Sequence, residues 1–89
     1  MFRVEWLDAA LDDLSAIWME ATPAERQSVT SACHELDQRL ARNPLDESES
    51  RPNDLRIAFA PPLTVRIRVD TSHNLVVVLR ANMYRRRPS

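Results

Sequence analysis

Residues 55–84 read LRIAFAPPLTVRIRVDTSHNLVVVLRANMY, and this stretch decides the fold class. Apolar residues recur at every second position, which is the side-chain period of a β-strand with one buried face. The first run ends at Pro61-Pro62, and the polar residues 70–74, DTSHN, are typical of a hairpin turn. The stretch therefore predicts three consecutive strands, over residues 55–60, 64–70 and 75–83.

The alternation also predicts which side chains share a face of the sheet. We expect the large apolar residues of these strands to face the core: Leu55, Ile57, Phe59, Val65, Ile67, Val69, Leu75, Val77 and Leu79. Four arginines then emerge together on the solvent-facing side: Arg56, Arg66, Arg68 and Arg80. Polar residues are ordinary there, but four charges of one sign repel each other unless an anion binds. The pattern favours a surface for phosphates or for an acidic partner.

The residues before this stretch change period. Phe2, Val4 and Trp6 alternate with polar residues and predict a short strand. Asp8 is expected to cap a helix with an apolar stripe at Leu7, Leu11, Leu14, Trp18 and Ala21. Thr22-Pro23-Ala24-Glu25 is a helix-start signal, and Asn43-Pro44 is a stop. The second helix between them has its stripe at Val29, Cys33, Leu36 and Leu40.

Residues 44–54, PLDESESRPND, hold two prolines and four acidic residues and predict a solvated linker. The element order is then βααβββ. We expect an α+β fold in which a two-helix hairpin packs on one face of a four-stranded, mainly antiparallel sheet, with the first strand beside the C-terminal three. The expected core comprises Trp6, Leu14, Trp18, Leu36, Ile57, Phe59, Ile67 and Leu79.

Length and composition bound the function. Eighty-nine residues form one domain, expected to span residues 1–89, and the hydrophobic fraction of 44% excludes a disordered chain. The longest apolar run, Leu75 to Leu79, is far shorter than the roughly 20 residues of a membrane helix, so a cytoplasmic protein with no membrane partner is expected. Cys33 is the single cysteine, and His34 has no second ligand four residues on, so we expect no disulfide, metal or cofactor.

Charge divides the chain in two. Residues 1–50 carry four arginines against eleven acidic residues, a net charge of −7, whereas residues 51–89 carry eight against two, a net charge of +6. All twelve cations are arginine, whose guanidinium binds phosphate oxygens in pairs but cannot act as a general base. Glycine is absent, so Asn43, Asn53 and Asn74 are the expected positions of positive φ.

The order βααβββ and the second half of the chain resemble the RelE/ParE superfamily of bacterial type II toxin–antitoxin toxins. In that family an arginine-containing strand ending in Val-Asp leads through a short turn into a valine-rich strand and an arginine-rich segment. The matching pieces are residues 65–70 (VRIRVD), 76–80 (VVVLR) and 84–88 (YRRRP). The resemblance spans essentially the whole chain. It implies a toxin that is held inactive by a cognate antitoxin covering the basic face, and a role in plasmid stabilization.

The resemblance implies two different activities. RelE-like members cleave messenger RNA in the ribosomal A site, whereas ParE-like members poison DNA gyrase and are not nucleases. We expect an mRNA interferase-like endoribonuclease acting on ribosome-bound mRNA, with Arg66, Arg68, Arg80 and Tyr84 carried over as catalytic residues. Four further arginines are expected to bind RNA or the antitoxin: Arg56, Arg85, Arg86 and Arg87.

One departure from the family keeps the alternatives open. RelE-like nucleases commonly have lysines in the loop and second strand, where this chain has Arg51 and Arg56. The general base is then left to Glu5, His73 or Tyr84. The missing lysines favour a toxin that binds gyrase, and a non-catalytic module for an acidic partner is the third possibility.

Overall fold

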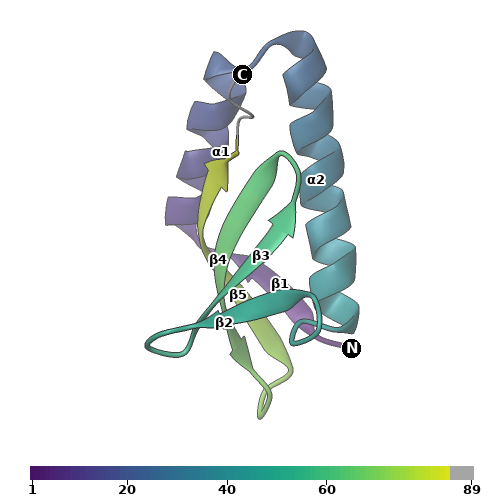
Figure 1. Cartoon of the computed structure of the whole chain (residues 1–89), viewed down its shortest axis with the longest axis vertical. Coiled ribbons are helices and arrows are strands. Elements are labelled where there is room, and N and C mark those ends of the chain that lie inside the picture. The colour runs from purple at the N-terminus through teal and green to yellow at the C-terminus, as the bar shows by residue number, and fades with distance from the viewer. Residues whose placement is uncertain (85–89) are drawn as a thin grey trace.

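Two helices lie on one face of a five-stranded sheet in the computed structural model, which describes residues 1–84 (Figure 1). The α+β class and the two-helix hairpin predicted from the sequence are confirmed. In chain order the elements are β1 (Arg3–Trp6), α1 (Asp8–Glu20), α2 (Pro23–Arg42), β2 (Ser48–Arg51), β3 (Leu55–Ala60), β4 (Leu63–Asp70) and β5 (Leu75–Met83).

The fifth strand, β2, lies in the segment predicted to be a linker. It pairs antiparallel with β3 and forms one edge of the sheet. Its sequence, SESR, has no alternating apolar residues, which is the pattern used to predict the other strands. Only Ser48 is buried, and the next three residues are exposed. Charged side chains are usual on an edge strand, since they discourage pairing with another chain. The prediction of four strands was therefore wrong by one.

The strand order is β1-β5-β4-β3-β2. β1 runs parallel to β5, and the other neighbours are antiparallel, so the predicted position of the first strand is confirmed. The Phe2 N–H donates to the Ala41 carbonyl at 2.8 Å, which ties the chain start to the end of α2. Neither helix within residues 1–84 is long and apolar enough to cross a bilayer.

The helix boundaries follow from their capping residues. The Thr22 hydroxyl accepts the Glu25 N–H at 3.2 Å, and the Glu25 carboxylate accepts the Thr22 N–H at 2.9 Å, which completes the predicted capping box. α2 ends at Arg42, before the predicted stop. Asp8 does not cap α1, because it is the first helical residue and the cap position belongs to Leu7, which makes no side-chain cap bond.

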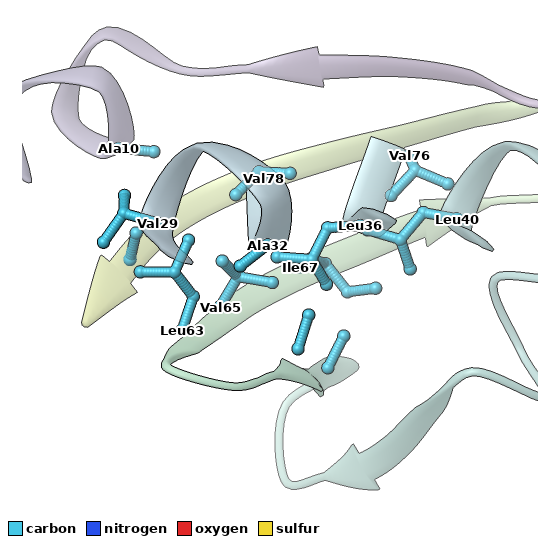
Figure 2. Close-up of a cluster of buried hydrophobic side chains, with 13 residues drawn as sticks. Ala10, Val29, Ala32, Leu36, Leu40, Leu63, Val65, Ile67, Val76 and Val78 are labelled. Carbon is cyan, nitrogen blue, oxygen red and sulfur yellow. The ribbon is translucent and has the colours of Figure 1, made fainter. Parts of the chain in front are cut away.

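The core lies between the helices and one face of β3, β4 and β5 (Figure 2). Leu36 and Leu40 of α2 point toward Ile67 of β4, and Ala10 is the buried residue of α1. Val4, Trp6, Leu14 and Ile17 pack partly buried against this cluster. The fully buried large side chains are Leu36, Leu40, Leu63, Ile67, Val29, Val65, Val76 and Val78.

Two strands present the opposite face from the one predicted. In β3 the buried residues are Ala58 and Ala60, while Phe59 is 48% exposed. In β5 Val76 and Val78 are buried, so Val77 and Leu79 lie on the other side. Both strands have apolar residues on both faces, and period 2 alone does not say which set is inside.

Of the eight core residues predicted, Leu36 and Ile67 are fully buried. Trp6 and Leu14 are partly buried against the core, Ile57 and Leu79 lie on the other face, and Trp18 and Phe59 are exposed.

The turns follow the absence of glycine. β4 ends at Asp70 and β5 begins at Leu75, so the predicted hairpin turn is confirmed. Positive φ falls at Asn53 (65°), Asp54 (59°) and Asn74 (50°). Asn43 has φ of −143°, so its expected positive φ was wrong. Asn and Asp tolerate the left-handed region because their short polar side chains bond locally to the backbone.

Candidate nucleic-acid interface

The side of the sheet that faces away from the helices carries Arg66 and Arg68, and we call it the open face. Both residues belong to β4, where they alternate with the buried Val65 and Ile67. Both are exposed, and among residues 1–84 neither has a carboxylate within ion-pair distance. The predicted position of these two arginines is therefore confirmed, and their guanidinium donors are free to bind phosphate oxygens.

Arg80 starts beside these two arginines, but its charge is compensated. It is the cross-strand partner of Arg66, next to a register shift that leaves Leu79 without a partner in β4. Its Nε donates to Asp13 Oδ2 at 2.8 Å, and its Nη2 donates to Asp13 Oδ1 at 3.0 Å. The Ala81 N–H donates to the same carboxylate at 2.9 Å. Asp13 therefore fastens α1 to the edge of β5 and neutralises Arg80.

The pKa of Asp13 is lowered by these contacts. The largest cause is the hydrogen bond from the Arg80 side chain, followed by the one from the Ala81 backbone. The Asp13 side chain is 19% exposed and that of Arg80 is 59% exposed, so solvent screens Asp13 less than Arg80. A carboxylate held in this way stays ionised, and Arg80 keeps a counter-ion at neutral pH.

Arg56 does not lie on the open face, which corrects the prediction. Its cross-strand partner in β4 is the buried Ile67, so its side chain leaves the sheet on the helix side. There its Nε donates to Ser48 Oγ at 2.7 Å, and its Nη2 donates to the carbonyls of Ser48 (2.9 Å) and Leu45 (3.0 Å). The guanidinium holds β2 and the preceding turn against β3. The reversed face of β3 is the reason for the error.

Tyr84 directly follows β5 and is 67% exposed. Its N–H donates to the carbonyl of Pro62, so its backbone is held beside the turn between β3 and β4. Four residues separate Tyr84 from Arg80, or roughly 13 Å along an extended strand. Tyr84 therefore lies apart from Arg66 and Arg68. The predicted binding residues Arg85, Arg86 and Arg87 lie outside the described residues.

The candidate bases are separated from each other. His73 is in the turn after β4, where its Nδ1 lies 2.7 Å from Asp70 Oδ2, and this hydrogen bond is the largest cause that lowers the pKa of Asp70. Glu5 lies on the open face and forms an ion pair with Arg3 at 3.0 Å. Val77 is the partner of both Glu5 and Arg68, so these two lie roughly 10 Å apart across β5.

Two hollows in the open face show which residues lie beside Arg66 and Arg68. Arg68 lines one together with Val77 and two carboxylates, Asp54 and Asp70, which weaken the positive potential there. Arg66 lines a second hollow of about 290 Å³ with Arg51 and Ile57. Its full lining is Arg51, Pro52, Asn53, Leu55, Ile57 and Arg66. The sequence feature that could have predicted this second hollow is the alternation of Glu49 and Arg51 with serines in β2.

No metal site accompanies the arginines. Within residues 1–84, no three His, Cys, Asp or Glu side chains gather into a group that could hold a metal ion.

The same fold occurs in bacterial toxin–antitoxin complexes. A chain of the RelBE2 complex from Mycobacterium tuberculosis superposes with a TM-score of 0.71 at 23% identity, covering 92% of this chain and 96% of that one. A chain of the chromosomal ParDE system from P. aeruginosa gives 0.70 at 18% identity, covering 96% and 98%. The intact E. coli RelBE complex gives 0.60 at 13% identity, covering 97% and 100%.

Sequence comparison alone does not reach these proteins. No protein-family model matches the chain, and no curated protein matches it. The likeness is one of backbone architecture and extends over nearly the full length of each partner. The chain therefore has the RelE/ParE toxin fold that its strand motifs predict.

Proposed function

We propose that the chain is the toxin of a type II toxin–antitoxin pair and that it acts on RNA through Arg66 and Arg68. The observation that carries this proposal is the exposure of these two arginines, which have no ion-pair partner within residues 1–84, on the open face of a fold found in such complexes. Two cations one strand repeat apart suit the phosphates of a single strand. A cytoplasmic site of action follows from this target.

The proposed reaction is transesterification of ribosome-bound messenger RNA. The ribose 2′-oxygen attacks the adjacent phosphorus, the bond to the 5′-oxygen breaks, and the products are a cyclic phosphate and a 5′-hydroxyl. The 2′-hydroxyl proton goes to a base, for which we propose Glu5, a carboxylate on the open face, and the 5′-oxygen takes a proton from water. Arg66 and Arg68 stabilise the charge that accumulates on the phosphorane oxygens.

The remaining predicted residues take other roles in this proposal. Arg80 ties β5 to α1 and is not a phosphate ligand in this proposal, because Asp13 holds its guanidinium and compensates its charge. Tyr84 is too far along β5 to contact the phosphate held by Arg66. A cognate antitoxin inhibits the toxin by covering the open face, and acidic side chains on that antitoxin match Arg66 and Arg68.

The test is inducible expression of the chain in bacteria with growth and mRNA 5′ ends followed together. The wild type is expected to slow growth and produce 5′-hydroxyl ends in translated messages. The double variant Arg66→Ala/Arg68→Ala should lose both effects, because removing one charge-stabilising donor costs roughly a hundred- to a thousandfold in rate. Arg42→Ala removes an exposed arginine from α2 and is the matched control. Growth arrest that survives the double variant contradicts the proposal.

A second candidate is inhibition of DNA gyrase without cleavage. The observation that favours it is that two candidate proton-transfer groups already have partners. His73 is paired with Asp70, and Glu5 is paired with Arg3. A supercoiling assay with purified gyrase separates the two candidates. Inhibition of supercoiling without new RNA ends supports the second, and new RNA ends with unaffected gyrase support the first.

A further inference from the structure

The hollow between β2, β3 and β4 has the chemistry of a nucleotide site. Leu55 and Ile57 contribute apolar surface, and Arg51 and Arg66 contribute guanidinium groups from the strands on either side. Its volume of about 290 Å³ is close to the lower end of ligand pockets in proteins, which begin at about 300 Å³. We propose that this hollow holds one nucleotide of a single-stranded RNA, a proposal that rests on the function proposed above.

The two arginines are not equivalent. Arg51 Nη2 lies 3.0 Å from Glu49 Oε2, and its Nη1 donates to the Ser50 carbonyl at 2.9 Å. Its charge is therefore compensated, and its guanidinium plane is fixed by two partners. Arg66 has no carboxylate partner among the described residues. Arg66 thus supplies the charge for the phosphate, and Arg51 supplies a flat surface on which a base stacks.

The position of the hollow is set by a tight turn. Asn53 and Asp54 both have positive φ, and this turns the chain back so that Arg51 of β2 pairs with Leu55 of β3. Ile57 pairs with Arg66 on the next strand. The apolar residues therefore lie between the two arginines, in the arrangement that a base flanked by its own phosphate requires. A stacked base is worth roughly 1–3 kcal/mol, or about five- to 160-fold in affinity.

The experiment compares two short single-stranded RNAs, one intact and one abasic at a single nucleotide. Both carry the same phosphates, so their difference in affinity measures the base alone. Titration by calorimetry is expected to show at least fivefold tighter binding of the intact RNA. Arg51→Lys keeps the charge but removes the plane, and it should reduce intact binding to the abasic level while leaving abasic binding unchanged.

Three further variants make the outcome decisive. Ile57→Thr keeps the branched side chain but removes apolar surface, and it should act like Arg51→Lys. Leu11→Ala removes exposed apolar surface from α1, away from the open face, and should have no effect. Arg66→Ala should weaken both RNAs equally, because it removes a phosphate contact. Circular dichroism checks folding, and Arg51, being exposed, is a test that does not depend on the core.

The two proposals fail in different ways. If Arg66→Ala weakens RNA binding but the intact and abasic RNAs bind equally to the wild type, the nucleotide site is wrong and the function proposed above stands. In that case we expect the hollow to bind an acidic side chain of a protein partner instead of a base. If Arg66→Ala and Arg68→Ala leave RNA binding unchanged, the RNA function itself is overturned.

Discussion

At the scale of single residues, Asp13 has the most consequences for the site. Its carboxylate accepts two hydrogen bonds from Arg80 and one from the Ala81 N–H. These residues are 67 and 68 positions away in the sequence, so the pattern of α1 offers no sign of the contact. Arg66 and Arg68 could be predicted because they alternate with Val65 and Ile67 on one strand. A side chain held from another element could not.

Removing the Asp13 carboxylate should destabilise the fold. Asp13→Ala leaves the Ala81 N–H without its acceptor, and loss of a hydrogen bond to a charged group costs about 1.5–3 kcal/mol in typical proteins, discounted here to about 1–2 because Arg80 remains solvated. Urea unfolding measures the change. Asp12→Ala, on the exposed side of α1, is the control and should shift stability by less than about 0.5 kcal/mol. Equal effects would mean that the contact is not stabilising.

The same carboxylate should make stability depend on pH. The hydrogen bond from Arg80 lowers the pKa of Asp13 in the folded chain below the unfolded value of about 3.9. A lowered folded pKa adds stability above the unfolded pKa, and this part is lost as pH falls through the folded pKa. Asp13→Asn should therefore be less stable than wild type at pH 7, and the difference should shrink below about pH 4. A difference that does not shrink as the pH falls below about 4 contradicts this account.

At the scale of elements, the helices could be predicted and the faces of two strands could not. Residues 22–25 specify the start of α2 by local chemistry, which a sequence shows directly. In β3 the apolar set is divided between large residues and alanines, and the buried ones are Ala58 and Ala60, under α2. Small residues there allow a helix to approach closely. In β5 the unpaired Leu79 interrupts the period.

The reversed face of β3 predicts an unusual mutational pattern. Phe59→Ala should cost less than about 1 kcal/mol, because the ring is 48% exposed, whereas a core phenylalanine costs about 3–5 kcal/mol. Ala58→Leu adds volume at a residue that is 1% exposed and should cost about 1–3 kcal/mol. Thermal unfolding ranks the two variants. The opposite ranking would mean that Phe59 is the inward residue.

Arg56 gives a prediction for β2. Its guanidinium donates to Ser48 and Leu45 at three acceptors from two nitrogens, which the single nitrogen of a lysine ammonium does not reproduce. Arg56→Lys should therefore release the edge strand. Native-state hydrogen exchange is expected to show lost protection at residues 48–51 with unchanged protection in α2. Protection retained across residues 48–51 would show that the backbone pairing with β3 is sufficient on its own.

At the scale of the whole molecule, the second half of the chain is basic, but contacts within the fold engage part of its positive charge. The second half of the chain has a net charge of +6, yet Arg56 holds β2 and Arg80 is paired with Asp13. Counting arginines in the sequence therefore overestimates the cationic surface. The described open face keeps Arg66 and Arg68 as uncompensated charges, so two phosphates is the number that these strands can neutralise.

This number fixes how steeply RNA binding depends on salt. Each neutralised phosphate of a single strand contributes about −0.7 to the slope of log K against log salt concentration, so two contribute about −1.4. Arg66→Ala/Arg68→Ala should make the slope shallower by that amount, whatever other residues contribute to the wild-type value. Arg80→Ala should change it by much less, since Asp13 already compensates that charge. Calorimetric titrations with a short RNA between 50 and 200 mM salt measure all three slopes. An equal loss for Arg80→Ala would show that the Asp13 contact opens when RNA binds, and that Arg80 then joins the phosphate site.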